Sequence, residues 1–205
     1  MTELVPIPSP GIPLFYGDPG NPVVIVLHDW YGRLPGLDSF AEALASRGLR
    51  VAVPDLYQGV CTTDAATAES LMTSLDLSTA LAEVDDAIAQ AQDTGDERVA
   101  IVGFSMGGWL GLLHAQGGSV DAVVAYYASL SEAEHGVIPC PVLFQWAEVD
   151  EWETGDGPEE FVARLKDHGT PVTEHRYIGT EHGFANASIP SKINAQAAAL
   201  AFART

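Results

Sequence analysis

The chain carries very little basic charge. Its 205 residues include 9 Lys and Arg against 28 Asp and Glu, which gives a formal net charge of −19, and lysine occurs only at positions 166 and 192. Nucleic acids and anionic membranes are bound through basic surfaces. The composition therefore argues against both as partners, and it also disfavours a polyanionic ligand. A solvated acidic surface explains the charge as well.

Cysteines and long apolar runs are also scarce. The two cysteines, Cys61 and Cys140, lack the spacing of a zinc site or a redox pair, so we expect ordinary thiols, no metal and no cofactor. No apolar run is long enough to span a bilayer. Residues 1–20 contain five prolines and no apolar segment of the kind found in a leader peptide. We therefore expect a soluble, cytoplasmic protein.

Apolar runs of strand length alternate with segments of helical periodicity along the whole chain. No repeat or linker marks a second domain, so we predict a single domain over residues 1–205. Continuous apolar runs are typical of parallel strands that helices cover on both faces. The pattern predicts strands at 22–27, 49–53, 98–104, 121–126, 141–146 and 174–177, and helices at 37–47, 78–92, 106–116, 158–168 and 191–203.

One of these strands runs directly into the sequence Gly-Phe-Ser-Met-Gly, residues 103–107. A serine between two such glycines, at a turn from strand to helix, is the pattern of a nucleophile elbow. Gly103 and Gly107 would let two backbone segments approach closely, so that Ser105 Oγ stands clear. A capping serine in a glycine-rich turn explains this window alone equally well, so the hypothesis depends on residues elsewhere.

Asp150 and His182 follow later strands and supply the partners that a serine nucleophile needs. A base must take the hydroxyl proton, and an acid must orient that base. His182 is favoured because Gly183 and Phe184 follow it, a turn and a buried anchor that would hold the ring inward. Three other carboxylates compete with Asp150, which is favoured because it lies a short turn past the predicted strand; they are Glu148, Glu151 and Asp156.

The order Ser105, Asp150, His182 is typical of the α/β-hydrolase fold. We therefore predict a mostly parallel central sheet with helices on both faces. Residues 61–77 are too few for a large cap domain. The backbone N–H groups of Met106 and Trp30 are the natural oxyanion donors, and the helix that begins at Met106 would add favourable potential. The side chains of Trp30 and Tyr31 either pack in the core or line an acyl pocket.

Four segments are distributed along nearly the whole chain: His28-Asp29-Trp30-Tyr31-Gly32, Pro54-Asp55-Leu56-Tyr57, Gly103-Phe104-Ser105-Met106-Gly107-Gly108 and His182-Gly183-Phe184. They resemble the dienelactone hydrolase family. The resemblance implies ester or lactone hydrolysis, with Asp150 as the acid and Trp30 as the second oxyanion donor. We predict that Asp29, Tyr31, Tyr57 and Phe184 line the substrate pocket.

The sequence departs from the family pattern at three places. Ser105 stands where the founding enzymes have a cysteine nucleophile, and it depends fully on His182 for activation. Asp29 stands where they have a glutamate that pairs with the nucleophile, and its shorter side chain makes that contact doubtful. Residues 58–59 and 185–186 are Gln-Gly and Ala-Asn, where those enzymes hold a substrate carboxylate with arginines. We therefore expect dienelactone itself to be a poor substrate.

These observations predict a serine hydrolase that cleaves a small carboxylic ester or lactone through an acyl-serine intermediate. A short, open pocket mouth favours short acyl groups. Two alternatives stay open: an acyltransferase or perhydrolase using the same triad, and a binding protein on the hydrolase fold that lacks catalysis. The expected partner is a small-molecule ester or lactone, and the sequence leaves the oligomeric state undetermined.

Overall fold

The computed structural model of the chain describes residues 4–92, 98–152 and 157–205. It divides into two compact units, residues 1–100 and 101–205, which are taken in turn. Over the described residues the elements are β1 (Leu14–Tyr16), β2 (Val23–Leu27), α1 (Pro35–Ala45), β3 (Arg50–Val53), α2 (Ala65–Thr73), α3 (Leu77–Gln92), β4 (Val99–Phe104), α4 (Met106–Ala115), β5 (Ala122–Tyr126), β6 (Val142–Val149), α5 (Gly157–Asp167), β7 (Val172–Glu181) and α6 (Ala195–Arg204). The single domain stays a prediction.

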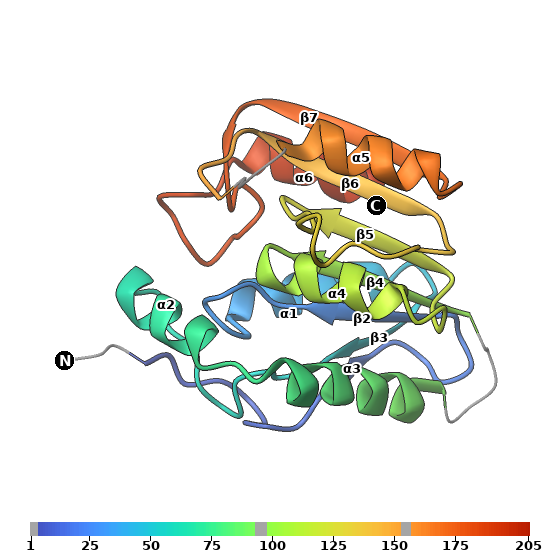
Figure 1. Cartoon of the computed structure of the whole chain (residues 1–205). Helices are drawn as coiled ribbons and strands as arrows, with labels where there is room; N and C mark the ends of the chain where they lie inside the picture. The colour runs from blue at the N-terminus through green and yellow to red at the C-terminus, as the bar shows by residue number, and fades with distance from the viewer. Residues whose placement is uncertain (1–3, 93–97, 153–156) are drawn as a thin grey trace. The chain divides into compact units, whose positions relative to one another are not determined.

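The first unit is built on three strands in the order β1-β3-β2. Strands β2 and β3 are parallel, and β1 pairs with β3 in the antiparallel direction. All five residues of β2 are buried, because α1 and α3 cover opposite faces of this part of the sheet (Figure 1). Polar loops follow β2 and β3, at residues 28–32 and 54–59.

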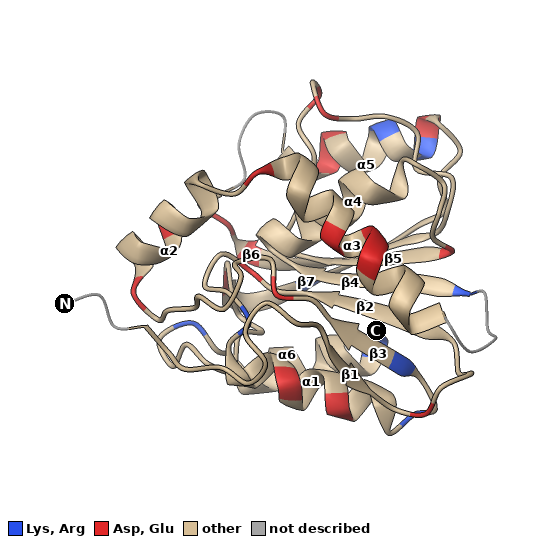
Figure 2. Cartoon of the chain, turned by 90° about the horizontal axis from the view of Figure 1, so that it is seen from below, with Lys and Arg blue, Asp and Glu red and all other residues tan. Residues whose placement is uncertain are grey.

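The second unit holds the strands β4-β5-β6-β7 in that order. The pairs β5–β6 and β6–β7 are parallel. Helices α4 and α5 cover one face of these strands and α6 covers the other (Figure 2). The residues that follow β4, β6 and β7 are Ser105, Asp150 and His182, so the parallel arrangement brings all three to the carboxyl edge of the strands.

The predicted α/β-hydrolase fold is confirmed, with helices on both faces of a mostly parallel sheet. Between β3 and α3 the chain inserts only the nine-residue helix α2, which agrees with the expected lack of a large cap domain. No helix among the described residues combines the length and apolarity needed to cross a bilayer.

Several predicted boundaries were wrong, and two elements were missed. Strand β1 is a three-residue strand that forms only by pairing with β3. Helix α2 buries a single residue, Ala68, so its sequence lacks a periodic apolar face. Strands β6 and β7 extend beyond the predicted runs, to Val149 and Glu181. These ends are strand because they pair with each other, so residues 148–149 and 180–181, which lie outside the predicted strands, belong to the sheet.

Candidate active site

Ser105 occupies a strained turn between β4 and α4. Its backbone has φ 53° and ψ −117°, a conformation that a residue with a side chain rarely adopts. The predicted need for glycine is confirmed on the Gly103 side, where a Cβ atom would lie 2.2 Å from the carbonyl oxygen of Gly107. The turn is therefore possible only because the end of the strand and the first turn of the helix can touch backbone to backbone.

A second close approach, at Gly108, was not predicted. A Cβ atom on Gly108 would lie 2.7 Å from Cβ of Ala128 and 3.0 Å from the carbonyl oxygen of Gly103. The doubled glycine of the elbow thus lets α4 pack against the segment that follows β5. The repeated glycine in the sequence was the available signal, although its partner Ala128 is visible only in the fold.

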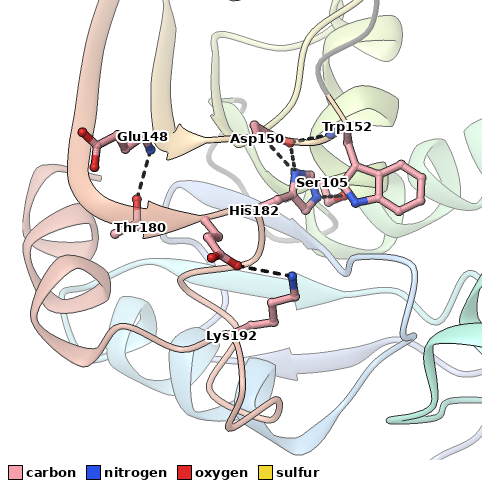
Figure 3. A network of polar contacts seen from close by, with 8 residues as sticks. Ser105, Glu148, Asp150, Trp152, Thr180, His182 and Lys192 are labelled. Atoms are coloured by element: carbon pink, nitrogen blue, oxygen red, sulfur yellow. Dashed lines mark hydrogen bonds and ion pairs between the residues drawn. The ribbon is translucent and has the colours of Figure 1, made fainter.

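Ser105, His182 and Asp150 form a continuous hydrogen-bonded chain (Figure 3). Ser105 Oγ lies 2.7 Å from Nε2 of His182. Nδ1 of His182 lies 2.8 Å from each oxygen of the Asp150 carboxylate. The Asp150 side chain is 3 % exposed, against 16 % for His182, so the carboxylate sits behind the ring and away from solvent.

The three competing carboxylates lie differently. Glu148 points to the neighbouring strand, where its carboxylate accepts a hydrogen bond from the backbone N–H of Gly179 at 2.6 Å. Glu151 is exposed, and Asp156 lies outside the described residues. Asp150 directly follows β6, without the short intervening turn that was predicted, and it accepts from the backbone N–H of Trp152 at 3.0 Å. That bond orients the carboxylate toward His182.

Two aromatic side chains beside His182 were not predicted. The rings of Tyr127 and Trp152 have their centroids 4.9 Å and 6.1 Å from that of His182. Tyr127 follows β5 with a backbone φ of 39°, and Trp152 is half-exposed. Tyr127 comes directly after the predicted strand 121–126, and that position was the signal in the sequence that could have identified it. Trp152 lies two residues past Asp150, and its nearness to that predicted acid was the available signal.

Helix α4 begins at Met106, the residue after the serine. Its N-terminus therefore lies at Ser105, and the helix dipole gives positive potential where an oxyanion would form. The N–H of Met106 as one oxyanion donor and the N–H of Trp30 as the other stay predictions. Trp30 belongs to the first unit, in the loop that follows β2.

The predicted pocket residues of the first unit lie in its two polar loops. The carboxylate of Asp29 accepts a hydrogen bond from the backbone N–H of Tyr31 at 3.0 Å, so it folds back onto its own loop. Tyr31 and Tyr57 are buried, and burial raises the pKa of both hydroxyls. Their roles as pocket residues stay predictions.

Phe184, the fourth predicted pocket residue, lies in the second unit and is completely buried. Its ring packs near those of Tyr126, Tyr127 and Tyr177, at centroid distances of 5.1–6.4 Å. This position suits the expected anchor for the turn after His182, and it does not favour contact between Phe184 and a substrate.

His28 ties the two polar loops of the first unit together, a role that the sequence did not indicate. Its Nδ1 lies 2.7 Å from the carbonyl oxygen of Asp29, and its Nε2 lies 3.2 Å from the backbone N of Leu56. Since the carbonyl accepts and the N–H donates, the ring is neutral with its proton on Nδ1. Burial lowers the pKa of His28 from 6.5 to about 4.

The described part of the chain contains no group of three or more His, Cys, Asp or Glu side chains arranged to hold a metal ion. Cys61 and Cys140 are both buried free thiols, and burial raises the pKa of each. The reactive side chains that the structure brings together at the carboxyl edge of β4, β6 and β7 are Ser105, Asp150 and His182.

Comparison with known proteins identifies one family. The model of the dienelactone hydrolase family matches residues 14–205. Protein usf of Aquifex pyrophilus is 27 % identical over 181 residues, which cover 82 % of this chain and 78 % of that protein. Carboxymethylenebutenolidase 1 of Cupriavidus pinatubonensis is 26 % identical over 202 residues, which cover 90 % of this chain and 83 % of that protein.

The fold is also similar to that of solved structures. A dienelactone hydrolase-like promiscuous phosphotriesterase from metagenomic libraries superposes with a TM-score of 0.77 at 21 % identity. The match covers 94 % of this chain and 88 % of the other. At this level of identity the likeness establishes the fold.

Proposed function

The chain belongs to the dienelactone hydrolase family of α/β hydrolases, and on this basis we propose that it is a serine hydrolase of small carboxylic esters or lactones. The observation that carries the proposal is the unbroken chain of hydrogen bonds from Ser105 through His182 to Asp150. Each bond lies within the range expected of a working triad.

The proposed reaction begins with attack by Ser105 Oγ on the substrate carbonyl carbon. His182 Nε2 takes the hydroxyl proton as the new C–O bond forms, and Asp150 stabilises the imidazolium through Nδ1–H. The proton then passes from Nε2 to the departing alkoxide, which leaves an acyl-Ser105 ester. Water, deprotonated by the same nitrogen, then attacks this ester. The bond from the acyl carbon to Ser105 Oγ breaks, Nε2 returns its proton to Oγ, and the acid leaves.

The oxyanion of each tetrahedral intermediate needs fixed donors near Ser105. We assign the N–H of Met106 to this role, supported by its position as the first residue of α4. The N–H of Trp30 is the second donor by the family pattern in the sequence. The half-exposed ring of Trp152 lies beside that of His182, which suits an active site that binds apolar acyl or alcohol groups.

A substrate with a free carboxylate suits this chain poorly. Residues 58–59 are Gln-Gly where, by the family pattern, the dienelactone enzymes hold a substrate carboxylate with an arginine, and the Gln58 side chain donates a hydrogen bond to the carboxylate of Glu83. Neither of these groups attracts an anion. We therefore propose neutral esters and lactones as substrates and expect weak turnover of an anionic dienelactone, so efficient turnover of that lactone would contradict the substrate assignment.

The experiment that tests the proposal compares wild type with Ser105→Ala on p-nitrophenyl esters of increasing acyl length. We expect turnover of short esters that Ser105→Ala abolishes, together with one fluorophosphonate adduct on the wild type by intact mass. Products formed with added alcohol or peroxide separate hydrolysis from acyl transfer. If the folded wild type shows no turnover and no labelling, the serine hydrolase proposal is refuted and a binding protein is favoured.

A further inference from the structure

The register between β6 and β7 changes just before the proposed triad residues. From Val142, which faces Val172, to Ala147, which faces Tyr177, the two strands pair residue for residue. The next pair is Val149 with Glu181. One β6 residue, Glu148, therefore spans the same length as the three β7 residues 178–180, which form a bulge.

This bulge decides which residue of β7 meets Asp150. Beyond the pair of Val149 with Glu181, the next residues along the two chains are Asp150 and His182. If β7 kept the earlier register without forming a bulge, Thr180 would lie opposite Asp150 instead. The contact between the acid and the histidine thus depends on the bulge, even though the two residues are far apart in the sequence.

Three hydrogen bonds close the bulge. The Glu148 carboxylate accepts from the backbone N–H of Gly179 at 2.6 Å. The backbone N–H of Glu148 donates to Thr180 Oγ1 at 3.2 Å (Figure 3). The Thr180 hydroxyl in turn donates to the carbonyl oxygen of Tyr177 at 2.6 Å. Together these bonds join the end of β6 to both sides of the extra residues.

The conformation of the bulge explains why these residue types occur in it. Gly179 has φ +74°, in the left-handed region that favours glycine. Ile178 is 76 % exposed while Thr180 is 3 % exposed, so the bulge turns one side chain outward and keeps the hydroxyl inside. Only a side chain that both donates and accepts can bond the Tyr177 carbonyl and the Glu148 N–H at once.

We propose that Glu148 and Thr180 are positioning residues of the active site, because they lock the β7 bulge that sets His182 opposite Asp150. This inference rests on the proposed function. The hydrogen bonds of both residues join parts of the bulge and do not involve the triad. Their effect is on the geometry of the Nδ1–H bond, and thereby on how well Nε2 of His182 faces Ser105.

The test uses substitutions that keep shape and change hydrogen bonding. Thr180→Val is nearly isosteric and removes two bonds, Thr180→Ser keeps the hydroxyl, and Glu148→Ala removes the acceptor for Gly179. Thr173→Val is the matched control, because it is the same change at an exposed position of the same strand. Displacing a catalytic group by about 1 Å can cost about 100-fold in rate.

We expect kcat for a p-nitrophenyl ester to fall about 10-fold to 100-fold in Thr180→Val and Glu148→Ala, with KM almost unchanged. Thr180→Ser should restore most of the rate, and Thr173→Val should match wild type. Folded Thr180→Val and Glu148→Ala proteins with wild-type kcat would overturn the proposal. If Thr180→Val fails to fold, Glu148→Ala decides, because Glu148 is exposed.

A second measurement does not depend on turnover. We expect the proton on His182 Nδ1, which is bonded to Asp150, to give a strongly deshielded NMR resonance in the resting protein. We expect Thr180→Val to lose or shift this resonance and Thr180→Ser to keep it, while an unchanged resonance in Thr180→Val would overturn the proposal. An inactive wild type would refute the proposed function, and this resonance would still decide whether the bulge positions His182.

Discussion

The buried imidazole of His28 makes the stability of the protein depend on pH in a way that can be isolated. The ring is 1 % exposed and bridges the loops after β2 and β3 as a neutral donor and acceptor. Protonation of Nε2 would turn its acceptor into a second donor facing the Leu56 N–H. We therefore expect acid to weaken the first unit through this residue.

The sign and size of the effect follow from the shift in the pKa of His28. Its pKa is lowered from 6.5 to about 4 by burial, so between these values the unfolded chain binds a proton that the folded chain does not. The free energy of unfolding therefore rises with pH in this window, by about 1.4 kcal/mol per pH unit. The stabilisation is complete above pH 6.5, and about 2 kcal/mol of it is lost by pH 5.

The assay is urea unfolding of wild type and His28→Gln at pH 7 and pH 5, followed by circular dichroism. Glutamine can accept from the Leu56 N–H and does not titrate, so the stability difference between the two proteins should shrink by about 2 kcal/mol on acidification. His168→Gln, which removes an exposed imidazole, is the control and should show little change in this difference. If the free energies of unfolding of wild type and His28→Gln differ by the same amount at pH 7 and pH 5, the reasoning is refuted.

Three further changes test the site and the core. Asp150→Asn keeps the shape of the side chain but weakens its bond to Nδ1–H of His182, so kcat should fall about 10,000-fold, as it does for this change in a serine protease, with KM nearly unchanged. Gly103→Ala would bring a Cβ atom 2.2 Å from the Gly107 carbonyl oxygen. We expect it to abolish fluorophosphonate labelling and to lower the free energy of unfolding by about 3 kcal/mol or more. Gln145→Leu removes the completely buried acceptor of the Tyr177 hydroxyl, and urea unfolding should show a loss of about 2–4 kcal/mol.

Each change has a control nearby. Glu151→Gln alters an exposed carboxylate beside Asp150 and should keep the wild-type kcat; equal losses in both variants would contradict the choice of acid. Gly117→Ala meets its nearest atom at 3.3 Å and should cost far less than Gly103→Ala. Lys166→Met removes an exposed ion pair with Glu174 and should cost less than about 1 kcal/mol, so a loss equal to that of Gln145→Leu would contradict the buried-network argument.

The fold class, and the three residues that the structure joins in a hydrogen-bonded chain, could be predicted without coordinates. Continuous apolar runs identify strands that are buried on both faces, as with β2, because every residue of such a strand is shielded from water and is therefore apolar. The glycines around Ser105 reflect a backbone contact that no other residue permits. The positions of Asp150 and His182 after later strands then favoured them as the acid and the base, because parallel strands bring the residues that follow them to one edge of the sheet.

Other features depend on contacts between distant segments and leave little local signal. Strand β1 forms only against β3, and the polar ends of β6 and β7 become strand only by pairing with each other. Glu148 and Asp150 compete as carboxylates in the sequence, and only the β7 bulge directs one to Gly179 and the other to His182. The residue types in the sequence indicate which side chains could react. The register between strands depends on pairing between distant segments, and that pairing exists only once the chain has folded.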